Sequence, residues 1–422
     1  MNSKNFKYLN PDISKKIDRV LTHPVFGIII FFLVIVFIFE ATFGLGYYPM
    51  MGIEKLVILI ESFVSAYLPE SIVKSILIDG LIKGVGGVIV FLPNIVILFM
   101  MLSLMEETGY MSRVVKIMDK IMRPFGLDGR SFISLVMGFG CNVPAIMATE
   151  NIQNSRTRLI TILINPLMSC SSRFTVYVLF ISAFFPEHPV WVLLCIYFFM
   201  AFIALVLALL LKKFIRPGIH ESYISDMPGY RVPSATRMLG QIWFNSKLFL
   251  KKIGGVILIA SFIIWLLGYL PYGKQGKGNL EKSYIGMIGK AIEPVIRPLG
   301  FDWRMGVSLI SGIAAKETIT GTLSELYQAH LHDKKQKSYF VQKLHDQVYT
   351  EGKKIGQKVF TPLVALSFML FVSLYTPCVA TIGAVRRTTK SRKWAFFVVI
   401  YTTCLAWVVS FTVYQIGSLI GR

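Results

Sequence analysis

The chain has 422 residues, of which 54% are apolar, and a formal net charge of +21. A soluble protein of this length could not bury that much apolar surface in one core. The lysines and arginines lie at the ends of apolar runs instead of forming one stripe. This arrangement argues against nucleic-acid binding and is typical of positive-inside topology and of contact with anionic lipid headgroups. The composition predicts an all-α polytopic membrane protein.

Apolar runs long enough to cross a bilayer recur along the chain. We expect spans at residues 24–48, 84–104, 158–185, 190–211, 253–270, 360–385 and 394–420. Residues 52–78 are amphipathic and weakly charged, which favours an interfacial helix. The short apolar segments 131–149 and 305–323 are interrupted by glycines, and the first also by Pro144. Both are expected to be broken, re-entrant helices.

A duplicated motif divides the chain into two repeats. Residues 123–138 read RPFGLDGRSFISLVMG and residues 297–312 read RPLGFDWRMGVSLISG, 174 positions later and without a gap. A duplicated pair of short apolar segments interrupted by Gly or Pro is typical of a transporter's substrate site. The motif therefore predicts transport across a membrane.

The elements give the following expected domains. They are a basic cytoplasmic N-terminus at 1–23, a first span with the interfacial helix at 24–81, a first repeat at 82–214, a connector at 215–249, a second repeat at 250–392 with a soluble insert at 328–358, and a last span at 393–422. A re-entrant segment at 131–149 places both Arg130 and Arg156 in the cytoplasm and the acidic turn 185–189 outside. The first repeat then crosses three times, so the second enters from the opposite face. The two repeats are predicted to be inverted.

Three of the five cysteines lie next to a helix-breaking residue. Cys141 follows Gly140, Cys170 follows the Asn165–Pro166 pair, and Cys378 follows Pro377. Thiol and thioether ligands select soft or borderline metals such as Fe(II), Cu(I) or Zn(II). The pattern favours a metal path, with packing of a small apolar side chain as the alternative reading. Cys195 and Cys404 lie inside spans with no break nearby, and we expect them only to pack; the odd number argues against a disulfide framework.

Other candidate ligands accompany these thiols. They are Asn142, Met168, Ser169, Glu106 and Glu317. Lys316 precedes Glu317 within the second re-entrant segment, where ionisable groups are costly and usually functional. The two could form a structural pair or a gate whose charges part when an ion passes. His330, His332 and His345 lie in the soluble insert, whose lysines indicate a solvated helix pair.

The sequence contains no Gly-x-x-x-x-Gly-Lys-Ser/Thr loop and so no phosphate cradle of that type. It also contains no Ser-His-Asp or zinc-hydrolase spacing. These features predict a transporter, not an enzyme.

Six stretches together resemble the membrane region of FeoB-type ferrous iron transporters. They read GVGGVIVFLPNIVILF, LMEETGYMSRVVKIMDKIMRPFGLDGRSF, MGFGCNVPAIMAT, NPLMSCSSRFTVY, GIAAKET and YTPCVATI, and the similarity covers residues 22–415. The resemblance implies two Gate-type repeats and import of Fe(II) through the cytoplasmic (inner) membrane of a bacterium. Cys141, Cys170 and Cys378 would line the iron path, and Glu106 would attract the ion. Fe(II) would be the transported ion, with no permanently bound cofactor.

The chain departs from the family pattern in two places. Family members usually begin with a GTP-binding domain, whereas this sequence starts at what would be that domain's end. The resemblance therefore implies a separate GTPase docking near residues 1–23, or a small Feo-type accessory protein. Glu150 stands where the family tends to have arginine. Transport of Mn(II), a carrier for a nucleoside-like solute and a regulatory membrane partner remain alternatives, and the sequence leaves a homo-oligomer open.

Overall fold

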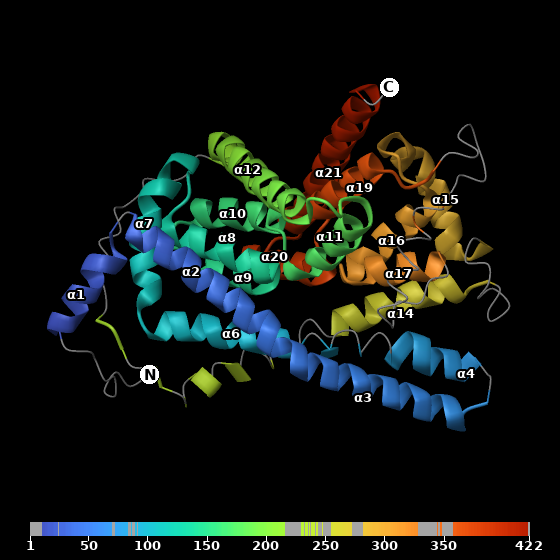
Figure 1. The fold of residues 1–422 in the computed structure, drawn as a ribbon, viewed down its shortest axis with the longest axis horizontal. Helices are drawn as coiled ribbons and strands as arrows, with labels where there is room; N and C mark the ends of the chain where they lie inside the picture. Colours follow the sequence, from blue (N-terminus) through green and yellow to red (C-terminus); the bar gives the residue numbers. More distant parts are fainter. Residues whose placement is uncertain are drawn as a thin grey trace. The chain divides into compact units, whose positions relative to one another are not determined.

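The computed structural model describes residues 11–23, 25–69, 72–82, 86, 89–90, 92–215, 229–231, 233–234, 236, 238–240, 242–243, 247, 255–271, 282–327, 344, 347 and 358–420. These residues are almost entirely helical, as the sequence predicts (Figure 1). The helices are α1 (Pro11–Leu21), α2 (Phe26–Glu40), α3 (Gly46–Tyr67), α4 (Ile72–Ser75), α6 (Leu92–Glu107), α7 (Tyr110–Met122), α8 (Gly129–Gly140), α9 (Asn142–Ala148), α10 (Ser155–Ile164), α11 (Ser171–Phe184), α12 (Pro189–Ile215), α14 (Gly255–Tyr269), α15 (Tyr284–Ile296), α16 (Trp303–Ala314), α17 (Thr318–Leu326), α19 (Pro362–Leu374), α20 (Val379–Thr389) and α21 (Arg392–Ile420). Most of the connector and of the soluble insert, including its three histidines, lies outside the described residues.

Four helical runs within the described ranges are long and apolar enough to cross a membrane. They are Ser155–Phe184, Pro189–Ile215, Pro362–Thr389 and Arg392–Ile420, and they confirm the spans expected at 158–185, 190–211, 360–385 and 394–420. Two bent pairs, α1 with α2 and α6 with α7, raise the number to six if each counts as one span. The remaining expected spans are represented by α2, α6 and α14, each of 15 or 16 residues. The chain is thus an all-α polytopic membrane protein with broken helices.

The helical run that begins with α2 continues past residue 48, the predicted end of the first span. A five-residue π-helical segment, Ala41–Leu45, joins α2 to α3, so the chain stays helical from Phe26 to Tyr67. The predicted interfacial helix therefore begins earlier than residue 52. Leu56, Leu59 and Phe63 are exposed along α3, which fits a helix that faces lipid.

The duplicated motif folds in the same way in both copies. Helices α7 and α15 end at the Arg-Pro pairs, and each pair forms a 3₁₀ turn, Arg123–Phe125 or Arg297–Leu299. Gly126 and Gly300 follow with φ of 76° and 85°, a conformation that glycine adopts without steric cost. All these boundaries lie 174 positions apart, as they do in the sequence.

An aspartate then starts the next helix in each copy. The Asp128 carboxylate accepts from the backbone N–H of Ser131 at 2.7 Å, and Asp302 accepts from that of Met305 at 2.9 Å. Such side-chain caps satisfy N–H groups that a helix leaves open at its start. Helices α8 and α16 both run twelve residues and break at corresponding positions, Cys141 and Ala315. The duplication is therefore structural as well as sequential.

The chain folds into two compact units, each built from separate stretches. Unit 1 comprises Met1–Gly140, Pro144–Asn165 and Leu205–Leu258, and unit 2 comprises Cys141–Val143, Pro166–Ala204 and Ile259–Arg422. In unit 1, Phe31 of α2 packs on Val114 and Met118 of α7, and on Phe132 of α8. In the same unit the Asn165 amide donates to Ser134 of α8 at 2.9 Å, which fixes the residue before the Pro166 break.

In unit 2, helix α19 packs against α11 and α21. The adjacent red ribbons of α19 and α21 are visible in Figure 1. Phe180 of α11 and Phe301 both pack on Phe368 of α19, with ring centroids 5.1 and 5.4 Å apart. The α19–α20 run is 78% buried, whereas α12 and α21 are each only 22% buried. Broken helix α19–α20 is thus the centre of this unit, and the apolar outer faces of α12 and α21 suit contact with lipid.

Candidate functional site

The three break cysteines each stand at the start of a half-helix. Cys141 separates α8 from α9, Cys170 is the residue that precedes α11, and Cys378 is the residue that precedes α20. Cys170 and Cys378 have extended backbones, with ψ of 166° and 154°. A helix start presents N–H groups without intrahelical partners and the positive end of the helix dipole. The structure thus confirms that each thiol lies at a break.

The three cysteines also belong to one unit and lie near one another. Cys170, Cys378 and Glu317 all lie within electrostatic range of the Cys141 thiol. All three cysteines are free and partly buried, whereas Cys195 and Cys404 are exposed on the helix surface. Within the part of the chain that the structure describes, no three His, Cys, Asp or Glu side chains are placed to hold one metal ion together.

A basic side chain donates to the free carbonyls at two of the breaks. Arg173, which is 1% exposed, donates to the carbonyl oxygens of Met168 and Pro166, at 3.0 Å each. Lys316, which is 2% exposed, donates to the carbonyl of Thr376 at 2.7 Å. Both breaks therefore present oxygen atoms that a cation can bind.

Glu317 connects the second re-entrant segment to the Cys170 break. Its carboxylate accepts a hydrogen bond from the hydroxyl of Ser172, at the start of α11. Glu317 thus lies next to the Cys170 break, and its role as a metal ligand stays a prediction. The structure shows no direct bond between the side chains of Glu317 and Lys316.

Ser169 takes part in a buried chain of hydroxyl groups. Its oxygen lies 2.6 Å from the Tyr177 hydroxyl, which lies 2.6 Å from that of Ser373, and Ser373 donates to the Met369 carbonyl. A serine hydroxyl that donates to Tyr177 still has lone pairs that could bind an ion. Asn142 and Met168, the other candidate ligands, are each 4% exposed.

Comparisons with known proteins show which family the chain belongs to. The Gate family, described as nucleoside recognition, matches residues 88–184 and 250–392, more than half of the chain. The C terminus of ferrous iron transport protein B matches residues 193–244. The chain belongs to the FeoB family.

The FeoB relatives extend beyond the matched region. An Fe(2+) transport protein A/Fe(2+) transporter FeoB fusion protein of Porphyromonas gingivalis is 42% identical over 96% of this chain and 52% of its own length. The Fe(2+) transporter FeoB of Campylobacter jejuni is 38% identical over 97% of this chain and 66% of its own length, and that of Staphylococcus aureus 37% over 96% and 59%. The chain thus spans about half to two thirds of the curated relatives it matches. No solved structure shows significant similarity.

Two acidic residues of interest in this FeoB-family chain lie in unit 1. Glu106 is exposed at the end of α6, and Glu150 is exposed in the 3₁₀ turn Thr149–Asn151. The role of Glu106 in attracting the ion stays a prediction. Its neighbour Glu107 accepts from the backbone N–H of Ser234 at 2.9 Å, which attaches part of the connector to the end of α6.

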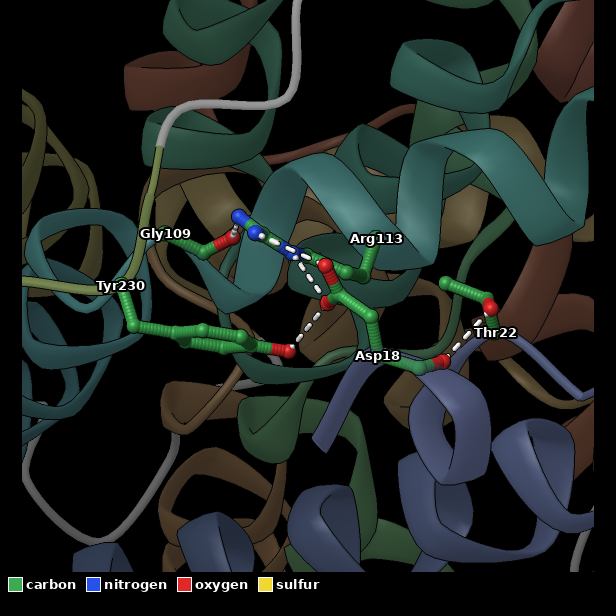
Figure 2. A network of polar contacts seen from close by, with 5 residues as sticks. All are labelled: Asp18, Thr22, Gly109, Arg113 and Tyr230. Atoms are coloured by element: carbon green, nitrogen blue, oxygen red, sulfur yellow. Dashed lines mark hydrogen bonds and ion pairs between the residues drawn. The ribbon is translucent and has the colours of Figure 1, made fainter. Parts of the chain in front are cut away.

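Sequence reasoning did not find a polar network at the N-terminal side of unit 1. Asp18 of α1 accepts from Arg113 Nε at 3.0 Å and from the Tyr230 hydroxyl at 2.7 Å, and the guanidinium lies 4.1 Å from the Tyr230 ring centre (Figure 2). Arg113 also donates to the Gly109 carbonyl at 2.9 Å. We call Asp18, Arg113 and Tyr230 the N-terminal latch. It fixes the helix before the first span to α7 and to the connector.

The latch also sets the protonation of its members. Burial acts to raise the pKa of Asp18, but the hydrogen bonds from Arg113 and Tyr230 and the charge of Arg113 outweigh it, so this pKa is lowered. Burial and the hydrogen bond to Asp18 raise the pKa of Tyr230, which keeps its hydroxyl a donor. Because these groups lie far apart in the sequence, no local pattern signals their contact.

Proposed function

We propose that the chain is the permease part of a FeoB-type system and passes Fe(II) across a bacterial cytoplasmic membrane. The main support is the position of Cys141, Cys170 and Cys378, each at the start of a half-helix and all in one unit. Thiol sulfur is a ligand that Fe(II) accepts and that Mg²⁺ or Ca²⁺ does not prefer. Glu317 adds a hard, negatively charged oxygen beside the thiols.

Transport needs sites that an ion can both enter and leave. A closed set of four ligands would hold Fe(II) too long, whereas single thiols alternating with carbonyl oxygens give several shallow stations. The broken helices supply both kinds of ligand at the same places, because each break frees backbone oxygen and begins a new helix.

Anaerobic Fe(II) flux into proteoliposomes tests this proposal. We expect flux with the unmodified chain and a loss of about tenfold or more in Cys141→Ser and Cys170→Ser, the effect of one ligand worth about 1.4 kcal/mol. Cys195→Ser and Cys404→Ser are the matched controls, since these thiols are exposed outside the breaks. Equal flux in all four variants would contradict a thiol-lined path.

A nucleoside-like solute is the second candidate substrate, because the matching Gate family is described as nucleoside recognition. An organic solute does not need thiols at helix breaks. Uptake of labelled uridine that persists in Cys141→Ser and Cys170→Ser, with no Fe(II) flux in the unmodified chain, would favour this candidate. Competition by Mn(II) in the Fe(II) assay measures the selectivity between the two metals.

We further propose that a GTPase and a small accessory protein act with this chain. The name of the Porphyromonas gingivalis relative, which joins transport protein A to FeoB, supports the accessory protein. Purification of the tagged chain from bacterial membranes, followed by GTP-hydrolysis assays of the bound fraction, tests the GTPase. Flux that is independent of GTP and of any bound protein would contradict both partners.

A further inference from the structure

The free carbonyl of the second broken span is occupied by an ammonium group. Lys316 Nζ lies 2.7 Å from the Thr376 carbonyl oxygen and 3.0 Å from the centre of the Tyr375 ring. Thr376 precedes Pro377, in the gap between α19 and α20, where the chain offers no helical N–H to this carbonyl. A metal ion bound at this place would meet the same two groups as the ammonium, namely a carbonyl oxygen without a helical N–H partner and the face of an aromatic ring.

The surroundings of the ring are fixed, so the oxygen and the ring face keep their places. The Tyr375 hydroxyl donates to the Leu309 carbonyl at 3.2 Å, and the ring stacks on Phe371 at 5.5 Å. Gly312 permits this approach, because a Cβ on Gly312 would lie within 2.3 Å of the Tyr375 hydroxyl. The ammonium is therefore the adjustable part of the contact.

The same break carries two further atoms that can bind a metal. The Thr376 hydroxyl belongs to a residue that is 5% exposed, and it has no hydrogen-bond partner among the residues that the structure describes. A buried hydroxyl without a partner is costly, which makes it a candidate ligand. The Cys378 thiol follows two positions later and lies 3.2 Å from the Thr381 hydroxyl. Carbonyl, hydroxyl and thiol thus come from two residues, Thr376 and Cys378, on either side of Pro377.

In the first broken span, the free carbonyls are bound by a fixed cationic side chain, that of Arg173. There Arg173 comes from the half-helix that follows the break and donates to two carbonyls, those of Met168 and Pro166. A rigid guanidinium with two bonds is held in one place. Lys316 instead reaches the Thr376 carbonyl with one bond, on a flexible stem, from the break between α16 and α17. Lys316 can leave its oxygen at a much smaller cost.

We infer that the Thr376 carbonyl, the Thr376 hydroxyl and the Cys378 thiol form a divalent-metal station, in which the Lys316 ammonium holds the carbonyl until an arriving ion displaces it. The inference rests on the proposed function for the identity of the ion. Two cations cannot share one oxygen without strong repulsion, so ammonium and metal exclude each other. Lys316 therefore weakens the station and prevents a deep trap, and a monovalent ion, with half the charge, displaces it less well.

Protection of Cys378 from alkylation measures occupancy of the station without transport. The full-length chain in detergent is titrated anaerobically with Fe(II), treated with N-ethylmaleimide, and the Cys378 peptide is quantified by mass spectrometry against the metal-free sample of the same variant. The half-protecting Fe(II) concentration should fall about tenfold in Lys316→Met, which removes the competitor, and rise about tenfold in Thr376→Val, which removes one ligand. Lys316→Arg keeps a cation, so its half-protecting concentration should not fall below that of the unmodified chain.

Matched controls separate the station from general packing effects. Thr388→Val removes another buried hydroxyl without a partner among the described residues, in the last turn of α20, and Lys393→Met removes an exposed lysine. Both variants should have the same half-protecting Fe(II) concentration as the unmodified chain. Equal half-protecting concentrations in Lys316→Met, Thr376→Val and the unmodified chain would overturn the inference, even where Fe(II) flux supports the proposed function. Protection that follows the expected order in a chain without flux would support the station and count against transport.

Discussion

Cys170 and Cys378 occupy the same position in two broken spans. The two broken spans are Ser155–Phe184 and Pro362–Thr389. In each, the cysteine has an extended backbone and directly precedes the second half of the span, which is α11 in the first and α20 in the second. Both cysteines lie within electrostatic range of Cys141. On the proposed function, two equivalent thiols in one unit would give an ion two similar stations in succession.

Cys378→Ser should therefore impair Fe(II) flux about as strongly as Cys170→Ser. We expect a loss of about tenfold, because each substitution removes one sulfur ligand from an equivalent place. Cys404→Ser, on exposed α21, is the control and should keep the flux of the unmodified chain. Full flux in Cys378→Ser would show that only the first broken span carries the path.

The hydroxyl chain allows the role of Ser169 to be separated from that of its partner. Ser169→Ala and Tyr177→Phe both remove the contact at 2.6 Å. The Tyr177 hydroxyl keeps its contact with Ser373 in Ser169→Ala, whereas Tyr177→Phe removes both contacts, so we expect losses of about 1 kcal/mol and about 1–3 kcal/mol of the free energy of unfolding. A thermal-shift assay in detergent measures this. If Ser169 is also a ligand, only Ser169→Ala should lower Fe(II) flux beyond its stability effect. Equal flux in the two variants would leave Ser169 a purely structural residue.

The sequence predicted the breaks because glycine and proline act locally. Gly140, Pro166 and Pro377 each interrupt a helix whatever lies elsewhere in the chain. The duplicated motif likewise fixed the register of α8 and α16, since the same turn residues give the same turns. Four spans could be read from length and apolarity alone.

The partners of the charged residues could not be predicted in this way. Lys316 bonds to a carbonyl 60 positions away, Arg113 to a carboxylate 95 positions away, and Tyr177 to a hydroxyl 196 positions away. Such contacts follow from how helices pack, for which a single sequence carries no periodic signal. The sequence could identify Lys316 and Glu317 as unusual intramembrane charges, but it could not predict the contact between Lys316 and the Thr376 carbonyl.

The positions of the basic residues predict from which side of the membrane each repeat enters. Arg386, Arg387, Lys390 and Arg392 line a hollow of about 500 Å³ at the turn between α20 and α21. The positive-inside rule places this turn in the cytoplasm, together with Asn154, and inverted repeats then place Gln336 outside. Single epitope tags at Asn154, Lys390 and Gln336, probed in intact and permeabilised cells, measure the three positions. Gln336 on the same side as Asn154 would contradict the inverted arrangement.

The N-terminal latch should respond to acid. Because the pKa of Asp18 is lowered in the folded chain, the carboxylate stabilises the fold above its ordinary pKa of 3.8, and this contribution is lost as the pH falls through the lower folded value. The melting temperature of Asp18→Asn should thus lie below that of the unmodified chain by a constant amount between about pH 5 and 8. The difference should shrink only below the ordinary aspartate pKa. A difference that changes near neutral pH would point to another titrating group.

The buried latch should matter far more than a surface ion pair of similar geometry. Arg113 is 2% exposed in its side chain and pairs with Asp18, whereas Arg123 is 46% exposed and pairs with Asp119. Arg113→Met removes the charged partner of the Asp18 carboxylate, which keeps only the Tyr230 hydroxyl, and it removes the side-chain donor to the Gly109 carbonyl, so we expect a loss of about 2–3 kcal/mol. Arg123→Met removes an exposed pair one helical turn apart and should cost less than about 0.5 kcal/mol. Thermal-shift assays of both variants in detergent give the comparison, and similar shifts would mean that the latch does not hold α1 to α7.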